Sequence, residues 1–452
     1  MDKLELQAWP TLVFHHCVSI KFMYSNTNQP LYIWFIDVGM GDATFILFPN
    51  GKTALVDFGS TKVSSIIDDV LKFFDNIGEI KDITQKKTLK EISDYKEFFT
   101  NKTIDFLFIT HPDTDHYNLV TRLTENMKFT FNNVYYTGNL NDYKNNFDQW
   151  LTNQVKVGVA KLLDTPNGLK MNADFGGVDL YVLIANFAVN TSRLISNSRS
   201  IVLMLKYGSQ KVILAGDATY LTESQILNNI KDWHDQPGSI MSQELDIQGA
   251  ILKLGHHGSA RTSTSKEWVE AVKPIALFIS AERTGTQTGS DGSKTGHRLP
   301  QVAAIDTVLQ FSPKSLQEFK DIYFSYIGYY DKKDENSCFG KSRSFQHFNQ
   351  TNSNSQDILD YHTFKKDDTT QPDNYYYEIK TNKAIFTTIC KLDYPVTTTS
   401  PAKLADLGTT YGLVIDSQGG WNVFPWLNDF YSFNHWHTDE AQKGFHLGIE
   451  IK

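Results

Sequence analysis

The stretch at residues 104–116, IDFLFITHPDTDH, joins an apolar run of strand length to a short polar loop. The loop carries His111, Asp113, Asp115 and His116. Imidazole and carboxylate groups bind divalent ions of the zinc and manganese class, and a loop at the end of a strand can aim several of them at one point. The alternative is a surface loop whose aspartates cap the following helix. Taken alone, the stretch leaves both interpretations open.

The sequence before this stretch predicts three strands and a helix. Within residues 31–59, the segments LYIWFIDVG, ATFILFP and TALVDFG are apolar and rich in β-formers, and GMGD and NGK between them are turn signals. Residues 61–78 then place apolar side chains at helical spacing. The charged sequence at about 78–101 is interpreted as an insertion that carries a helix.

The sequence after the stretch predicts a second group of strands, interrupted by helices. The strand-like segments are VDLYVLIA, SIVLMLKY, KVILAGDA, ILKLG and IALFIS, and TESQILNNIKDW and KEWVEAVKP between them have helical patterns. This alternation favours two similar halves, each a sheet covered on its outer face by helices. The fold class expected is therefore a layered α/β sandwich.

Several of these strands end in further polar groups. Asp217 ends one strand, and the pair His256 and His257 follows another, next to a glycine that lets the backbone pass close to a ligand. Asp37 and Asp42 end the first good strand. Each could be structural by itself, but aspartates and histidines at four strand ends make coincidence improbable. The pattern favours the metal site.

In their order, DVGMGDATFI, ALVDFGS, THPDTDH, SIVLMLKYGSQKVILAGDA and LKLGHHGSARTSTS resemble the metallo-β-lactamase superfamily. More narrowly, they resemble the branch typified by the soluble domain of the competence protein ComEC. The resemblance covers about residues 31–300. It implies a four-layered αββα metallo-β-lactamase-like sandwich with a metal site at the sheet edge.

The resemblance also implies a set of ligands for one or two divalent ions, zinc or manganese. These are His111 and Asp113 for the first ion, Asp115 and His116 for the second, Asp217 as the bridge, and His257 or its neighbour His256 as the late ligand of the second ion. No histidine occurs between residues 117 and 216, so the mid-chain ligand of the first ion is missing. We expect the second ion to bind well, and the first site to be weak, open or suited to an oxygen-preferring ion such as manganese.

The expected function is a metal-dependent hydrolase, a phosphodiesterase or nuclease that acts through a metal-bound hydroxide on a nucleotide or nucleic acid. Asp115 is then catalytic as well as a ligand. His256 or His297 would protonate the leaving oxygen, although His297 could equally lie on the surface. Ser259 and Arg261 would hold phosphate oxygens, or would instead simply cap the next helix.

Two other functions stay open. The same site could hydrolyse a carboxylic ester, lactone or lactam. The missing histidine instead favours a non-catalytic or regulatory module that keeps the fold and one ion. Metal content and a panel of substrates separate these alternatives.

The composition of the chain limits the classes of protein to which it can belong. The 452 residues are 40% hydrophobic and 21% charged, with a net charge of -8, which predicts an ordered core and argues weakly against a non-specific nucleic-acid coat protein. The 3 cysteines form no CxxC pair, so no disulfide framework or cysteine zinc site is indicated. The chain shows no signal-peptide pattern and no apolar run of roughly 20 residues, so we expect a cytoplasmic protein with no membrane partner.

The domain organisation expected is a hydrolase domain at residues 1–312 followed by an accessory region at 313–452. Asn, Ser, Thr, Asp and Gln dominate residues 331–371, which predicts a polar linker. Strand-like pieces resume after it, so the accessory region is expected to be rich in β-structure. The sequence indicates no role or protein partner for it.

Overall fold

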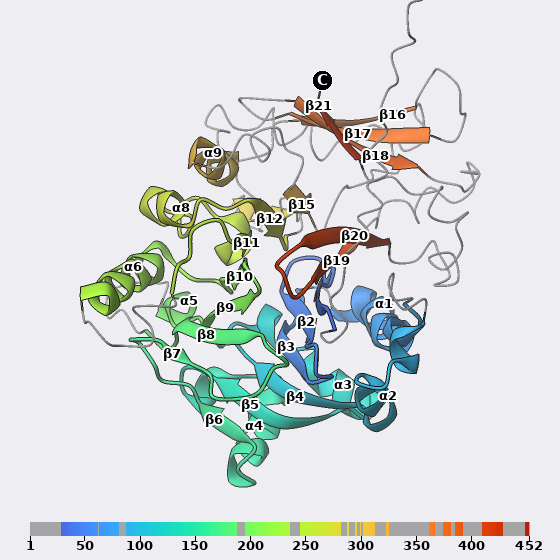
Figure 1. Cartoon of the computed structure of the whole chain (residues 1–452), viewed down its shortest axis with the longest axis vertical. Helices are drawn as coiled ribbons and strands as arrows, with labels where there is room; N and C mark the ends of the chain where they lie inside the picture. The colour runs from blue at the N-terminus through green and yellow to red at the C-terminus, as the bar shows by residue number, and fades with distance from the viewer. Residues whose placement is uncertain are drawn as a thin grey trace, which may run out of the picture.

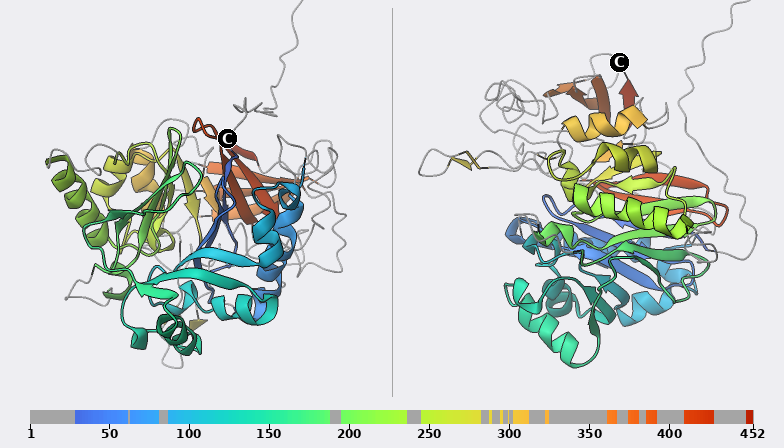
Figure 2. Two further views of the ribbon diagram at one scale, coloured as in Figure 1. Left: turned by 60° about the horizontal axis from the view of Figure 1, so that its bottom comes forward. Right: turned by 90° about the vertical axis from the view of Figure 1, so that its left-hand side faces the viewer.

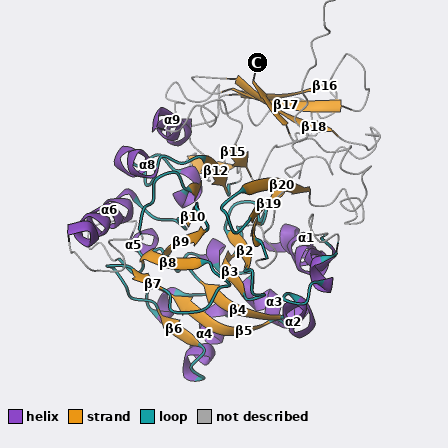
Figure 3. Cartoon of the chain, in the orientation of Figure 1, coloured by secondary structure: helices purple, strands orange, loops and turns teal. Residues whose placement is uncertain are grey.

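The computed structural model describes the following parts of the chain: residues 29–61, 63–80, 87–187, 195–235, 245–281, 287–288, 294–295, 299, 302–311, 322–324, 361–366, 374–380, 385–391, 409–427 and 448–451. Two mixed β-sheets face one another at the centre of this part, with helices on their outer faces (Figures 1 and 3). The predicted α/β class with two sheets is confirmed.

The first sheet contains eight strands in the order β20-β19-β1-β2-β3-β4-β5-β6. They are β1 Leu31–Phe35, β2 Ala43–Leu47, β3 Thr53–Phe58, β4 Thr103–Phe108, β5 Thr130–Tyr136, β6 Ala160–Leu162, β19 Thr409–Ile415 and β20 Trp421–Leu427. Pairs from β20 to β3 are antiparallel, and pairs from β3 to β6 are parallel. The opening stretch of the sequence is thus β4 and the loop that follows it.

The second sheet contains seven strands in the order β15-β12-β11-β10-β9-β8-β7. They are β7 Leu169–Lys170, β8 Asp179–Ile184, β9 Val202–Tyr207, β10 Gln210–Leu214, β11 Ile251–Lys253, β12 Ala276–Ile279 and β15 Ile322–Phe324. The pairs β10–β11, β11–β12 and β12–β15 are parallel, and the others are antiparallel. Parallel strands therefore lie in both sheets, and their carboxyl ends carry the loops of the site.

The apolar residues of each strand divide between two neighbouring layers. In β1, Tyr32 and Trp34 pack in the core under the helices, whereas Ile33 and Phe35 pack in the core between the sheets. Because both faces of such strands are buried, their sequences read as continuous apolar runs rather than as alternating patterns. The core between the sheets also receives strand residues of the second sheet, such as Leu203.

The helices complete the outer layers. α1 Val63–Asn76, α2 Lys96–Asn101, α3 Val120–Met127 and α4 Phe147–Lys156 lie on the side of the first sheet. α6 Tyr220–Asp235, α8 Lys266–Val272 and α9 Val302–Phe311 lie on the side of the second sheet (Figure 2). α2 falls in the segment interpreted as an insertion. Among the described residues, none of these helices has both the length and the apolar character needed to cross a bilayer.

The late strands β19 and β20 do not belong to an accessory region, as expected for residues 313–452, but to the first sheet. β19 pairs with β1, from Leu31 opposite Ile415 to Phe35 opposite Tyr411, so residues 409–427 extend the first sheet. This pairing covers β1, which would otherwise be the edge of the sheet. A contact between strands almost 380 residues apart leaves no local sequence signal. The domain boundary at residue 312 stays a prediction, but this part of the C-terminal region belongs to the main sheet.

Four other late strands form a sheet of their own. They are β16 Tyr361–Lys366, β17 Asn374–Lys380, β18 Ile385–Lys391 and β21 Gly448–Ile451, and all their pairs are antiparallel. β16 lies inside the segment that was predicted to be a polar linker. Its sequence, YHTFKK, is compatible with a strand as well as with a loop. The rest of the predicted linker up to residue 360 lies outside the described residues.

Candidate metal centre

The loops after three strands meet where the two sheets abut. The loop after β4 carries His111 to His116, the loop after β10 carries Asp217, and the loop after β11 carries His256 and His257. The backbone N–H of Ile201 donates to the carbonyl of Thr110 at 3.0 Å, which ties the second sheet to the start of the β4 loop. Carboxyl ends of strands from both sheets thus deliver the polar groups to one place.

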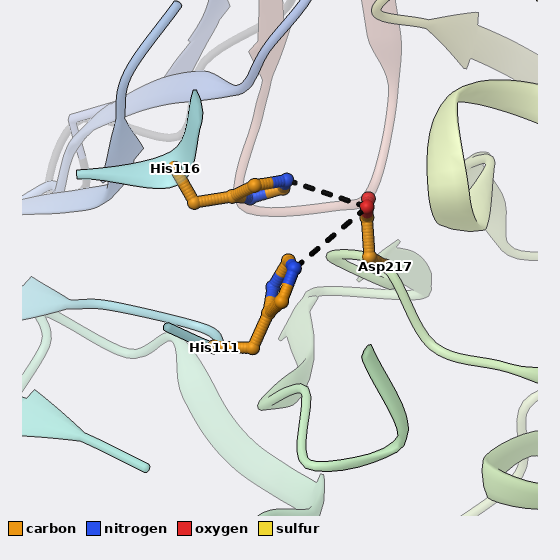
Figure 4. A group of neighbouring side chains, drawn as sticks. All are labelled: His111, His116 and Asp217. Atoms are coloured by element: carbon orange, nitrogen blue, oxygen red, sulfur yellow. Dashed lines mark ion pairs between the residues drawn. The ribbon is translucent and has the colours of Figure 1, made fainter. Parts of the chain in front are cut away.

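Asp217 lies at the centre of this group. Its Oδ2 is 3.8 Å from Nε2 of His111 and 3.4 Å from Nε2 of His116 (Figure 4). Its Oδ1 is 3.6 Å from Nε2 of His257. Two ligands that each lie about 2.1 Å from a tetrahedral ion are roughly 3.4 Å apart. The separations around Asp217 therefore suit ions held between the groups, with this carboxylate as the bridge.

The aspartates of the β4 loop lie on opposite sides of this bridge. Asp113 Oδ2 is 3.4 Å from His111 Nε2, and Asp115 Oδ2 is 3.8 Å from His257 Nε2. His111, His116 and Asp217 offer ligand atoms that all lie within 4.8 Å of one another, and so do Asp115, His116 and His257. The structure thus brings together all six residues of the predicted ligand set.

The buried polar atoms of the site fit a divalent ion. Within the described residues, no hydrogen-bond partner reaches Nε2 of His111, His116 or His257, or Oδ1 of Asp217. All four residues are buried. Leaving a buried polar atom unpaired costs about 1–3 kcal/mol, so four such atoms converging on one point are costly unless a ligand binds them. Nitrogen and carboxylate oxygen are the donors that zinc and manganese take.

Outer hydrogen bonds set the orientation of two of the histidine rings. Nδ1 of His116 lies 2.8 Å from Oδ2 of Asp57, and Nδ1 of His257 lies 2.7 Å from the carbonyl of Ser280. Carboxylate and carbonyl oxygens accept, so in both rings Nδ1 carries the proton and Nε2 presents its lone pair to the site. Asp57 is a functional residue for which sequence reasoning assigned no role. Its signal was its position at the end of the strand TALVDFG.

Asp42 lies behind the site in a buried ion pair. Its Oδ2 accepts from Nζ of Lys253 at 2.5 Å, and both side chains are almost fully buried. The same oxygen is 3.9 Å from Nδ1 of His116. Lys253 is a second residue that the sequence interpretation did not single out, since an isolated lysine in an apolar strand pattern gives no sign of its partner.

Glycines allow the backbone around Asp42 to lie in close contact with the β4 loop. A Cβ on Gly41 would lie 2.7 Å from the carbonyl oxygen of Asp115, and one on Gly59 would lie 2.5 Å from the same oxygen. The N–H of Asp42 donates to that oxygen at 3.2 Å. Only glycine fits at these two positions, so the GMGD and DFGS segments fix where the backbone of Asp115 lies.

The two adjacent histidines have different environments. Both have a positive φ, 46° for His256 and 55° for His257, and their ring planes are 68° apart. His257 is buried and faces Asp115 and Asp217, which favours it as the late ligand of the second ion. His256 is more exposed, and its Nε2 is 3.8 Å from Asp217 Oδ2.

The loop beyond the histidines supports His256. Thr262 donates its hydroxyl proton to Oγ of Ser259 at 2.7 Å, so its oxygen accepts from Nδ1 of His256, also at 2.7 Å. Ser259 is thereby engaged within the protein, whereas Arg261 is exposed. His297, the other predicted proton donor, lies outside the described residues.

Charges within the site oppose the effect of burial on the pKa values. Burial raises the pKa of Asp217, but His257, His116 and His256 hold it well below its ordinary value. Burial lowers the pKa of His116, but Asp217 and Asp57 raise it well above its ordinary value. Burial also raises the pKa of Asp113, which His111 and Ser196 nevertheless keep low. The carboxylates are thus kept anionic, as cation ligands require.

Comparisons with known proteins place this site in a family. Residues 36–267 match the family model described as the metallo-beta-lactamase superfamily. Among solved structures, the chain is similar to one described as a new diphosphatase from the PhnP family, with 11% sequence identity, a TM-score of 0.26, and coverage of 56% of this chain and 86% of that one. A search of curated proteins found no match.

Proposed function

The chain belongs to the metallo-beta-lactamase superfamily, and on that premise we propose that it is a metal-dependent hydrolase of phosphodiester bonds in a nucleotide or nucleic acid. The observation that carries the proposal is the set of unpaired imidazole nitrogens around Asp217. These atoms need a cation, and they lie beside the more exposed His256. Ion binding and a substrate-facing edge therefore occur in one place.

The ligands divide into two sets that share Asp217. His111 and Asp113 would hold the first ion, and Asp115, His116 and His257 would hold the second. Divalent ions in such sets polarise a phosphoryl oxygen and lower the pKa of water to roughly 7. Zinc suits the second set, which offers two imidazoles, and manganese suits the first set, which offers one.

The side chains around the ligands supply the remaining roles. Asp115 is partly exposed, so its carboxylate can accept a hydrogen bond from the attacking water as well as bind an ion. His256 holds a proton for the leaving oxygen. Burial lowers the pKa of His256, which makes its imidazolium form a stronger acid but reduces the fraction that carries this proton at neutral pH. Ser259 and Thr262 fix the ring of His256, and Arg261 pairs with a phosphate oxygen of the substrate.

The choice of a phosphodiester over a carboxylic ester has two supports. Two ions held by the groups around Asp217 would be able to stabilise the non-bridging oxygens of a phosphoryl group, whereas a carbonyl offers one oxygen. The five ordered motifs also resemble the ComEC branch, whose best-known member is linked to DNA degradation during uptake. Both supports concern the substrate rather than the metal site.

The test is turnover of bis(4-nitrophenyl) phosphate and of single-stranded and duplex DNA with zinc or manganese. Asp115→Ala should lower the rate by at least about 100-fold, the scale of losing a group that stabilises the transition state. Asp232→Ala, on the exposed face of α6, is the matched control and should keep the wild-type rate. Equal rates for the wild type and Asp115→Ala would contradict the proposal.

Two further outcomes have defined meanings. Turnover of nitrocefin or an acyl lactone, with none of the phosphodiesters, would assign the carboxylic substrate class instead. A protein that binds ions stoichiometrically and turns over none of these compounds would be the non-catalytic module. Both outcomes contradict the phosphodiesterase proposal and leave the metal site intact.

A further inference from the structure

Two consecutive residues before β9 contact both of the carboxylates that are proposed to bind the first ion. Oγ of Ser196 donates to Oδ1 of Asp113 at 2.7 Å, and Nδ2 of Asn197 donates to Oδ2 of Asp217 at 3.2 Å. Both residues belong to α5 Ile195–Ser198. α5 lies within residues 117–216, the part of the chain that has no histidine.

Neighbouring hydrogen bonds hold α5 in place. The hydroxyl of Ser198 donates to the carbonyl of Ile195 at 3.0 Å, and the hydroxyl of Thr222 on α6 donates to the carbonyl of Ser198 at 3.1 Å. At the start of β9, Oγ of Ser200 accepts from the backbone N–H of Asp217 at 3.1 Å. The segment is therefore fixed to the same loop that presents the bridging carboxylate.

These contacts determine which oxygen of Asp113 faces the ion. Its Oδ1 is occupied by the hydroxyl of Ser196, while its Oδ2 faces His111. Asp113 is thus restricted to binding through one oxygen. Asn197 fixes the Asp217 oxygen that faces His111 and His116, because an amide N–H donates and a carboxylate accepts. Each bond orients a ligand from outside the coordination shell.

We propose that Ser196 and Asn197 take the place of the missing mid-chain histidine, as positioning residues that make the first site rich in oxygen ligands and selective for manganese over zinc. The inference rests on the proposed metal-dependent function. An imidazole would bind the ion itself. A hydroxyl and an amide instead hold two carboxylates. With His116 assigned to the second ion, as proposed above, His111 is the one nitrogen ligand of the first ion, which favours a harder cation.

The test measures ion binding rather than turnover. The chain is stripped with a chelator and titrated with Mn²⁺ by calorimetry and electron paramagnetic resonance, and with Zn²⁺ against a competing chelator. The wild type should bind two Mn²⁺ per chain and show the spectrum of a spin-coupled pair. Ser196→Val replaces the hydroxyl with methyl groups and matches the shape of Ser196→Thr, and its first-ion Kd should rise about 10–100-fold. Only the spectrum of a single ion should then remain at moderate Mn²⁺ concentrations.

Matched variants separate positioning from folding. Ser196→Thr keeps the hydroxyl and should restore both ions, whereas Asn197→Leu should behave like Ser196→Val. Ile195→Ala, on the exposed side of α5, should leave both affinities at the wild-type level. The tight Zn²⁺ affinity of the second site should stay within about twofold in the Ser196 and Ile195 variants, which reports an intact fold.

The contradicting results are distinct. If Ser196→Val and Asn197→Leu bind both ions as the wild type does, the positioning role is wrong while the metal-dependent function stands. If the wild type prefers zinc over manganese at its weaker site, the selectivity is wrong. If the stripped wild type takes up neither Mn²⁺ nor Zn²⁺, the proposed function fails together with the inference.

Discussion

Asp57, at the end of β3, accepts hydrogen bonds from three groups. The N–H and the hydroxyl of Thr110 each lie 2.7 Å from its carboxylate, and Nδ1 of His116 lies 2.8 Å away. The backbone of Asp57 has a φ of 55°, which a non-glycine residue adopts only at a cost. This residue therefore connects the start of the β4 loop to the orientation of a metal ligand.

Asp57→Asn should weaken the binding of the second ion. An asparagine retains one acceptor oxygen but places an N–H donor where the carboxylate accepted, so Thr110 or His116 loses its partner. We expect the zinc affinity to fall about 10–100-fold and the protein to lose about 1–3 kcal/mol of unfolding free energy. Zinc competition and denaturant unfolding measure the two effects. Asp75→Asn, exposed on α1, is the control, and a wild-type zinc affinity in Asp57→Asn would rule out the role.

The residues proposed to bind the ions could be predicted because they follow apolar runs in a recognisable order. The residues that orient them were not. Asp57 and His116 are 59 positions apart, and Ser196 and Asp113 are 83 apart, so only the fold reveals each pair. The choice between His256 and His257 likewise depended on backbone conformation, which two identical adjacent residues do not encode.

At the scale of elements, α6 holds the loop that follows the paired histidines. Glu223 on α6 is buried and accepts from the backbone N–H groups of Thr264 and Ser265 at 2.7 and 2.8 Å. Burial raises the pKa of Glu223 to about 7, despite the opposing effect of these hydrogen bonds. A carboxyl that prefers to be neutral therefore anchors the loop that carries Ser259 and Thr262.

This carboxyl should make stability depend on pH. Its pKa is 4.5 in the unfolded chain and about 7 in the fold, so the folded state binds the proton more tightly. The resulting stabilisation is fully present below pH 4.5 and is lost as the pH rises through 7, a total of about 3 kcal/mol. Glu223→Gln removes this dependence. Denaturant unfolding between pH 4.5 and 8 should show the wild type losing stability relative to the variant, and parallel curves would contradict the assignment.

Some helices and strands could not be placed from local sequence patterns. The strands and helices of both halves follow from apolar periodicity, which is strongest where a face is buried. β19 and β20 have the same kind of pattern, but their place beside β1 depends on a contact across most of the chain. α5 is a single turn with the sequence ISNS, and nothing in this sequence separates it from an ordinary loop.

At the scale of the whole molecule, the metal centre joins the two halves. The first half supplies the four proposed ligands of the β4 loop, and the second half supplies Asp217 and His257. The ion pair of Asp42 with Lys253 crosses the same junction, buried behind the site. Removing one partner of a buried pair of this kind costs about 3–5 kcal/mol, because the other charge is left buried without a partner.

The most direct test of the central claim is a crystal structure with anomalous diffraction data collected at the manganese and zinc edges. Two anomalous peaks are expected on either side of Asp217, about 3.5–4 Å apart. One should lie between His111 and Asp113, with a manganese signal, and the other among Asp115, His116 and His257, with a zinc signal. Crystals soaked in both ions that show no peak among these residues would contradict the metal-dependent function.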